Sequence, residues 1–229
     1  PLYSLYMPKY AGVNDQGLPT WWAAKYKVNE AGTAYELDEN GQRIVEDWYT
    51  TSTYSDATQV IHGTAQPDVY GGFGTSLNFY GVDLSLNFVY QIGGQIYDSA
   101  YAASMASPTS SNIGSAYHAD LYDSWTQDNH HPTIPRFQYG DQYNNSSSDQ
   151  FITDASYLSL QNINLGYSLP QNVIKKIGLS RLRIYVACEN VWLWSQRQGL
   201  DPRQSFTGSA GAGYYSPVRT ISGGLNVTF

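Results

Sequence analysis

Few residues of this chain have the chemistry to hold a metal ion or to catalyse a reaction, and their spacing fits no known site. The stretch LDENGQRIVED resembles an EF-hand loop, but Arg43 stands where that loop needs glycine and Tyr49 where it needs glutamate. His130 and His131 are adjacent in a polar segment, without further ligands at a useful spacing. The chain has neither a G-x-S-x-G elbow nor a glycine-rich phosphate loop. We therefore predict no catalytic residue, no metal site and no cofactor.

Aromatic side chains offer more, because the chain has 21 Tyr and 6 Trp. In long loops such rings could contact a ligand or a neighbouring protein. The alternative is that these loops pack on their own aromatic residues. The candidates for contact with a ligand or a covering protein are Trp21, Trp22, Trp48, Tyr49, Trp125, Tyr214 and Tyr215.

The composition narrows the class of protein. The formal net charge is -7, which argues against nucleic acid as a partner. Only 14% of the 229 residues are charged, whereas soluble domains have roughly a quarter. No apolar run approaches the ~18 residues of a spanning helix. The single cysteine, Cys188, excludes an internal disulfide. Few charges with many Tyr and Gly residues favour a β-rich protein with long polar loops.

The segment VDLSLNFVYQI shows the clearest periodicity. Its apolar residues occupy every second position from Val82 to Ile92, with Asp83, Asn87 and Gln91 on the other face, as expected for a β-strand. The preceding segment FGTSLNFYG has the same alternation. Tyr80-Gly81 between the two segments predicts a hairpin with a tight turn.

Three further strands are predicted nearer the C-terminus. In SYLSLQNINLGYSL the apolar residues change from even to odd positions, which predicts a bulge near Gln161 or at the start of the strand. RLRIYVACENVWLW carries Trp192 and Trp194 at one end, either as a platform for sugar stacking or as part of an interfacial aromatic girdle, which we favour. ISGGLNVTF alternates up to its terminal residue, Phe229.

The predicted strands are roughly 8 to 14 residues long, and about 9–11 suffice to cross a bilayer at a tilt. Their connections alternate between short, at Tyr80-Gly81 and 170–180, and long, at 93–155 and 195–216. Short turns on one side and long loops on the other are typical of outer-membrane barrels. Residues 1–66 then form another outer loop, with a small hairpin that turns at Asn40-Gly41 as a type I′ dipeptide.

Several segments together resemble one family. Four segments are similar to the C-terminal barrel of SusC/RagA-type TonB-dependent transporters, namely DASYLSLQNINLGYSLP, IGLSRLRIYVACENVWLWS, GLDP and the terminal GGLNVTF. The hairpin that precedes these strands in the family resembles GGFGTSLNFYGVDLSLNFVYQIGGQIYD. Loops of these proteins resemble two further segments, DSWTQDNHHPTIPRF and PLYSLYMPKYAGVNDQGLPTWW. The resemblance covers nearly the whole chain, in the order and spacing of the family.

The resemblance implies an all-β fold, namely the C-terminal five antiparallel strands of a 22-stranded transmembrane barrel. It implies a nutrient importer in the outer membrane of a Gram-negative, Bacteroidetes-type bacterium, and not an enzyme. Its partners would be the rest of the barrel and its plug, a SusD-like surface lipoprotein as lid, TonB through the missing N-terminal part, membrane lipid, and an oligosaccharide or peptide as cargo. Glycan and peptide importers share these C-terminal features, so the cargo stays open.

The resemblance also implies an order of segments. It makes 1–66 an extracellular loop, 67–92 a transmembrane hairpin, 93–155 an extracellular loop, 156–194 a strand pair with a short periplasmic turn, 195–216 an extracellular loop and 217–229 the last transmembrane strand. Leu225, Val227 and Phe229 resemble the signal that barrel-assembly machinery recognises. The alternation along the strands places six polar residues on the side that would face the lumen of the barrel, which we call lumen parity. They are Asp83, Asn87, Gln91, Arg183, Glu189 and Asn226.

Five strands cannot close a barrel, since the smallest have about eight. An open sheet in lipid would leave unpaired backbone groups along two edges. We therefore expect further strands elsewhere in a longer protein, and interpret the start at Pro1 as a cut in an exposed outer loop. The rival interpretations are a secreted β-sandwich carbohydrate-binding module and a β-rich glycoside hydrolase, both of which would bury the apolar strand faces in a soluble core.

Overall fold

A computed structural model describes residues 2–205, 207–210 and 216–229 of the chain. The chain forms two compact units, and each unit combines two separate segments. The loop unit consists of Pro1–Gly63 and Tyr97–Ile152, and the sheet unit of Thr64–Ile96 and Thr153–Phe229. No helix among the described residues is long and apolar enough to cross a membrane.

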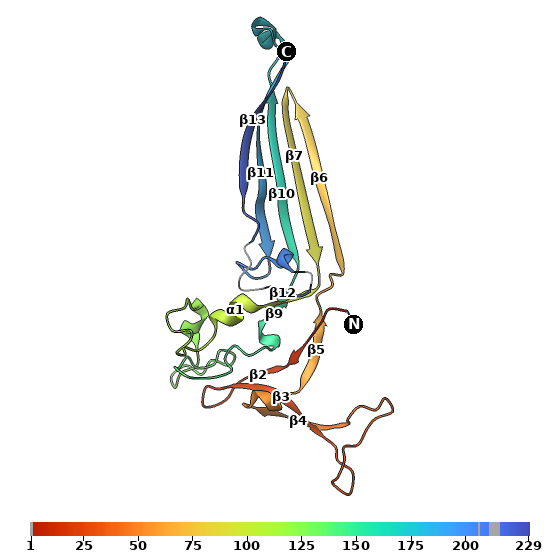
Figure 1. Cartoon of the computed structure of the whole chain (residues 1–229), viewed down its shortest axis with the longest axis vertical. Helices are drawn as coiled ribbons and strands as arrows, with labels where there is room; N and C mark the ends of the chain where they lie inside the picture. Colours follow the sequence, from red (N-terminus) through yellow and green to blue (C-terminus); the bar gives the residue numbers. More distant parts are fainter. Residues whose placement is uncertain (1, 206, 211–215) are drawn as a thin grey trace. The chain divides into compact units, whose positions relative to one another are not determined.

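The sheet unit is built on one five-stranded antiparallel sheet with the order β13-β11-β10-β7-β6 (Figure 1). Each long strand pairs with the long strand that precedes it in the chain. The five strands are β6 (Val69–Phe79), β7 (Val82–Ile92), β10 (Tyr157–Ser168), β11 (Arg181–Ser195) and β13 (Thr220–Thr228). The five strands predicted from the alternation of apolar residues are confirmed.

The turn between β6 and β7 has the predicted two residues. Tyr80 has φ 48° and Gly81 has φ 86°, and positive φ at both central positions is the signature of a type I′ turn. This turn matches the right-handed twist of the strands and closes the pair Phe79 and Val82. The backbone amide of Ser168 donates to the Gly81 carbonyl at 2.7 Å, which fastens the turn to the end of β10.

Two bulges interrupt the middle of the sheet. The register of β10 against β7 shifts between Leu160 and Asn162, so Gln161 is the extra residue and the predicted bulge is confirmed. A second bulge was not predicted: on β11, Asn190 and its neighbour lie opposite Gln161 alone, and Asn190 has φ 50°. Because of the first bulge, Leu160 shares a face with Ile163 although their numbers differ in parity.

The remaining elements of the sheet unit are short. Pro170 precedes a short helical segment in the 170–180 connection between β10 and β11, and Ile174 of this segment is 1% exposed. Ile96, Ala155 and Leu200 form a small buried cluster. The short elements are α2 (Gln171–Ile174), η4 (Lys175–Ile177) and η5 (Pro202–Gln204). A small sheet of order β12-β8-β9 is formed by β12 (Ser209–Ala210), β8 (Gln95–Asp98) and β9 (Ile152–Asp154), and the boundaries between the two units fall within β8 and β9.

The loop unit has its own apolar core, which contains Trp21 and Phe151 at 1% and 0% exposure. Ala102 and Met105 pack with Phe151. Its strands are β1 (Ser4–Pro8), which pairs with β5 (Gln59–Thr64), and the sheet of β2 (Tyr10–Val13), β3 (Pro19–Tyr26) and β4 (Val45–Thr51). Its helices are α1 (Ser99–Ser104), η1 (Tyr54–Asp56), η2 (Ala119–Asp123) and η3 (Asp149–Phe151).

A hairpin extends from β3 and β4, as predicted, but its turn differs from the prediction. Gly41 has φ 75°, whereas Asn40 does not have the positive φ that a type I′ turn requires. The Gly41 amide donates to the Asp38 carbonyl and the Asp38 amide to the Gln42 carbonyl, so three residues form the loop. The Asp38 carboxylate accepts the amides of Asn40 and Gln42, at 2.9 and 2.8 Å, and this local bonding favours the longer turn.

Candidate functional site

One face of the five-stranded sheet is almost entirely apolar. Its side chains are exposed: Leu77 is 59%, Leu225 63% and Ile221 70% accessible. The face carries Val69, Phe73, Leu77, Phe79, Val82, Leu84, Leu86, Phe88, Tyr90, Ile92, Leu158, Leu160, Ile163, Leu165, Tyr167, Leu182, Ile184, Val186, Trp192, Trp194, Ile221, Leu225 and Val227. Soluble monomers rarely leave so large a continuous apolar surface in water, so this face is suited to contact with lipid or with another apolar surface.

The opposite face of the same sheet is polar. The cross-strand register places all six residues of predicted lumen parity on it, which are Asp83, Asn87, Gln91, Arg183, Glu189 and Asn226. The two faces therefore separate apolar from polar side chains across five strands. That the polar face lines a lumen remains a prediction at this point.

An ion pair on the polar face joins β7, β10 and β11. Arg183 Nε donates to Asp83 Oδ1 at 2.9 Å, its Nη2 also contacts Asp83, and Nη2 donates to Asn164 Oδ1 at 3.0 Å. Gly166 lies directly under this guanidinium group, where any side chain would meet it. Gly224 lies in the same way under the ring of Tyr185. The long side chains therefore lie along the sheet, and the charge of Asp83 is neutralised.

The GLDP motif forms a buried anchor. Asp201 is 2% exposed and accepts hydrogen bonds from Arg203 Nε at 2.8 Å and from Nη2 at 2.7 Å. The hydrogen bond to Asp201 raises the pKa of the Arg203 guanidinium, which stays charged. Arg203 Nη1 also donates to Ser159 Oγ on β10 at 3.0 Å. The motif therefore fixes the start of the segment after β11 to the polar face of the sheet.

Trp21, a predicted contact residue, is a core residue of the loop unit. The ring centroids of Tyr10, Tyr54 and Tyr143 lie 6.4, 5.1 and 6.4 Å from its own, all in edge-on geometry. Burial raises the pKa of the Tyr10 phenol, whose hydroxyl donates to the Thr133 carbonyl. Trp21 has no open ring face for a ligand, so its prediction as a contact residue is wrong.

The other predicted contact residues differ in exposure. Trp48 and Tyr49 on β4 are 42% and 48% exposed, and Trp22 on β3 is half-buried. Trp125 stacks on His130 with centroids 5.4 Å apart, and Gly17 packs against its benzene ring. Trp125 is therefore partly covered by residues of its own unit. Tyr214 and Tyr215 lie outside the described residues.

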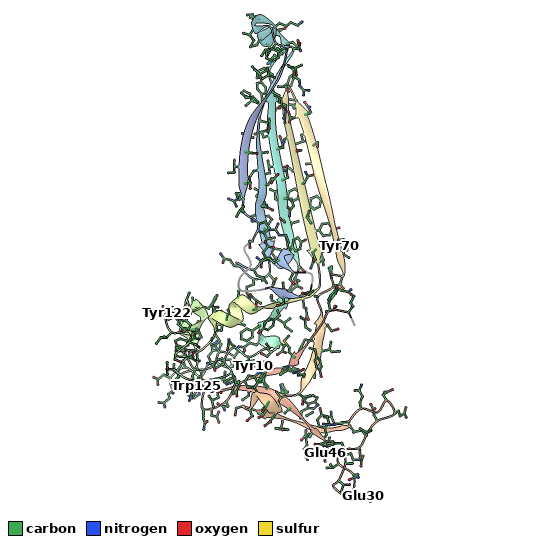
Figure 2. All side chains as sticks on the ribbon, viewed as in Figure 1. Tyr10, Glu30, Glu46, Tyr70, Tyr122 and Trp125 are labelled. Carbon is green, nitrogen blue, oxygen red and sulfur yellow. The ribbon has the colours of Figure 1, made fainter. Side chains whose placement is uncertain are left out.

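The structure adds aromatic residues that the sequence did not single out. Tyr117, Tyr122 and Phe137 line a depression of about 330 Å³, and Phe137 also borders a second one of about 540 Å³ beside Trp125. Figure 2 shows Tyr122 and Trp125 on the loop unit. The clustering of Tyr and Phe at 117–139 was the available signal. No group of three or more His, Cys, Asp or Glu residues suited to a metal ion occurs among the described residues.

The chain resembles known proteins over nearly its whole length, although no family model matches it. It is 26% identical to TonB-dependent receptor P3 of Formosa agariphila over 236 residues, which are 99% of this chain and 22% of that receptor. It is also 26% identical to receptor P26 of the same organism over 240 residues, covering 97% of this chain and 23% of that receptor. The chain thus spans less than a quarter of the length of these curated relatives.

The fold resembles part of a solved transporter. Against the structure of the RagAB peptide transporter the TM-score is 0.72, with 22% identity over 99% of this chain and 23% of that chain. Against the RagAB peptide importer in its open-open state the TM-score is 0.68, with 21% identity and coverage of 99% and 22%. The predicted resemblance to SusC/RagA-type TonB-dependent transporters and the predicted all-β barrel segment are confirmed. The total of 22 strands remains a prediction.

Proposed function

We propose that this chain is the C-terminal barrel segment of a TonB-dependent importer in the outer membrane of a Bacteroidetes-type bacterium. The importer would take up an oligosaccharide or an oligopeptide under a SusD-like lipoprotein lid. The chain contributes wall and outer loops, and chemistry on the cargo is not part of its role. The energy would come from TonB through the N-terminal part of the longer protein.

The observation that carries this proposal is the two-faced sheet. An apolar face that stays exposed on five adjacent strands suits acyl chains, and the polar face suits a water-filled or protein-filled interior. Among the described residues, no strand pairs with the outer edges of β6 and β13. In lipid each unsatisfied backbone group would cost several kcal/mol, so we infer that strands of the longer protein pair with both edges.

The proposal orders the segments along the membrane normal. The ranges 1–66, 93–155 and 195–216 would lie outside the cell, with the turn at Tyr80-Gly81 and the 170–180 connection on the periplasmic side. The transmembrane segments would be 67–92, 156–194 and 217–229. Trp192 and Trp194 would then lie in the outer interfacial girdle. Leu225, Val227 and Phe229 would form the assembly signal, so deletion of Phe229 should reduce the amount of protein in the membrane.

The two soluble alternatives require a cover for the apolar face. In a β-sandwich or a β-rich hydrolase a second layer would bury it. Val186 in the middle of β11 is instead 51% exposed, and no described element packs over this face. This observation disfavours both alternatives.

Site-directed spin labelling of the full-length protein in lipid vesicles tests the proposal. In a Cys188→Ser background, a label at Leu165→Cys on the apolar face should collide with oxygen dissolved in lipid. A label at Ser222→Cys on the polar face should collide with a water-soluble nickel complex. A label at position 165 that is reached by the nickel complex alone would overturn the membrane assignment.

Transport is tested separately in cells. Deletion of the gene or depletion of TonB should abolish growth on the imported nutrient, whereas growth on monosaccharides or amino acids should continue. Unchanged growth on every oligosaccharide and peptide mixture after deletion would contradict a role in nutrient import while leaving the barrel intact.

A further inference from the structure

Two depressions of the loop unit share Phe137 in their lining, and together they are called the groove around Phe137. The first, the apolar pocket, has a volume of about 330 Å³. The second, the amide pocket, has a volume of about 540 Å³. Both volumes lie in the range of small-ligand sites, roughly 300–1,000 Å³. Phe137 is part of both walls, so the two pockets adjoin each other at this residue.

The apolar pocket is suited to a large apolar side chain. It is lined by Tyr117, His118, Ala119, Leu121, Tyr122 and Phe137. The Tyr117 hydroxyl donates to the Asn112 carbonyl and His118 Nδ1 accepts the Asp120 amide, which leaves the Tyr122 hydroxyl and His118 Nε2 as the side-chain polar groups open to a ligand. A sugar ring would carry more hydroxyl groups than these two polar groups can bond, and each buried hydroxyl group left without a partner costs free energy. An aliphatic or aromatic side chain carries no such cost.

The amide pocket is suited to a polypeptide backbone. Its lining includes Gln16, Gln127 and Gln138, whose side-chain amides make no hydrogen bond to another described residue. Each primary amide offers donors and an acceptor, as each peptide group does. Arg136 lines the same pocket but donates to both Asp141 oxygens at 2.8 Å, and this hydrogen bonding raises the pKa of the guanidinium. Arg136 is therefore neutralised and does not attract anions.

The segment that supplies most of the lining of the groove is acidic. Residues 97–152 contain six aspartates and one arginine, and that arginine is the paired Arg136. Asp15 lies in the wall of the amide pocket itself and is exposed. A ligand with lysine or arginine beside its apolar side chain would gain from this field.

We propose that the groove around Phe137 binds an extended cationic peptide, with one large apolar side chain in the apolar pocket and the adjacent peptide groups on the amide pocket. The inference deepens the proposed import function, on which it rests, by assigning a cargo class and a contact site. Neutral oligosaccharide is the competing ligand class, and the experiment below distinguishes the two.

Binding to the full-length protein in detergent is measured by isothermal titration calorimetry. The probes are the peptide acetyl-Lys-Gly-Phe-Gly-Lys-amide, the same peptide with Gly in place of Phe, and maltopentaose. The Phe-containing peptide should bind at least tenfold more tightly than the other two. Raising the salt concentration from 50 to 500 mM should weaken its binding severalfold, because the attraction is partly electrostatic.

Three variants locate the site. Tyr122→Ala and Phe137→Leu should each weaken peptide binding, by about tenfold and severalfold, respectively. Tyr122 is 93% exposed, so its truncation removes little packing and the protein should stay folded. Tyr139→Ala is the matched control, since Tyr139 is 61% exposed in the same segment but lines neither pocket.

Each other outcome overturns the inference. Equal peptide affinity in all variants would place binding elsewhere, and no peptide binding would remove the site. Tighter binding of maltopentaose that depends on Tyr122 would assign the groove to glycans. Import and the lipid exposure of Leu165 are measured independently, so the groove can fail while the transporter assignment stands.

Discussion

The sheet unit and the loop unit treat their apolar side chains in opposite ways. In the loop unit Trp21 and Phe151 are buried, and strands and turns surround them. In the sheet unit the apolar residues of five strands remain exposed, and the strands are held by backbone ladders and by polar contacts such as Arg183 with Asp83. The loop unit thus buries apolar side chains in a core of its own, whereas the apolar face of the sheet is left open by the described residues. Under the proposed function, the loop unit would be adapted to water and the apolar face of the sheet to lipid.

The largest expected effect concerns the core of the loop unit. Trp21→Ala should destabilise this unit by about 3–5 kcal/mol, because it removes a buried indole ring from three tyrosines. Hydrogen exchange of the full-length protein should show the loss in the loop unit while protection in β7 and β10 persists. Trp48→Ala, at a 42% exposed position, should cost less than about 1 kcal/mol. Equal losses in both units would mean that they share one cooperative core.

The buried anchor of the sheet unit comes next. Asp201→Ala leaves the Arg203 guanidinium without its carboxylate, which should weaken the anchoring of residues 196–205 by about 3 kcal/mol. Faster hydrogen exchange in that segment is the measurement. Glu46→Gln is the control in the loop unit, where Lys25 and Glu46 are both largely exposed and no change should be detectable. A silent Asp201→Ala variant would show that other contacts hold the segment.

Adjacent positions on β11 test the two faces. Val186→Arg places a charge on the apolar face and should cost about 2–4 kcal/mol in lipid vesicles. Ala187→Arg places the same side chain on the polar face and should cost less than half as much. Urea unfolding from vesicles measures both. If the two variants were equally stable, the apolar face would not be in contact with lipid.

Substitution of one glycine in each unit compares how much the two turns contribute to stability. Gly81→Ala should cost about 1–2 kcal/mol from its positive φ alone, and a Cβ there would lie 2.7 Å from the Ser168 carbonyl oxygen. Gly41→Ala has a similar φ but open space around it, so its smaller loss of about 1 kcal/mol should stay within the hairpin. Thermal unfolding and hydrogen exchange of both variants provide the check. A larger loss at Gly41 would contradict the tight attachment of the sheet turn.

The sheet was predictable because its determinants are local. The alternation from Val82 to Ile92, the Tyr80-Gly81 turn and the parity change at Gln161 are all visible in a few consecutive residues. The bulge at Asn190 was not, because β11 keeps its parity through it and only pairing with β10 shows the extra residue. The turn at Asn40-Gly41 was predicted as type I′, since the dipeptide alone does not show that the Asp38 carboxylate favours a longer loop.

The candidate site was less predictable, since it depends on contacts between distant segments. Trp21 was predicted as a contact residue, since nothing in the sequence around it shows that it is buried. Its burial arises from packing against Tyr54 and Tyr143, which lie far along the chain. The groove around Phe137 combines residue 16 with residues near 120 and 137, and no motif links them. The face of the sheet on which a residue lies, by contrast, could be predicted from the alternation of side chains along a strand, as for Arg183 and Asn226 on the polar face.

The glycines beneath Arg183 and Tyr185 have a consequence for the width of the proposed pore. In a closed cylinder, a guanidinium group that stands upright from the wall would narrow the bore by the length of its side chain. Gly166 and Gly224 leave room for both groups to lie against the backbone, so neither side chain would extend its full length into the bore.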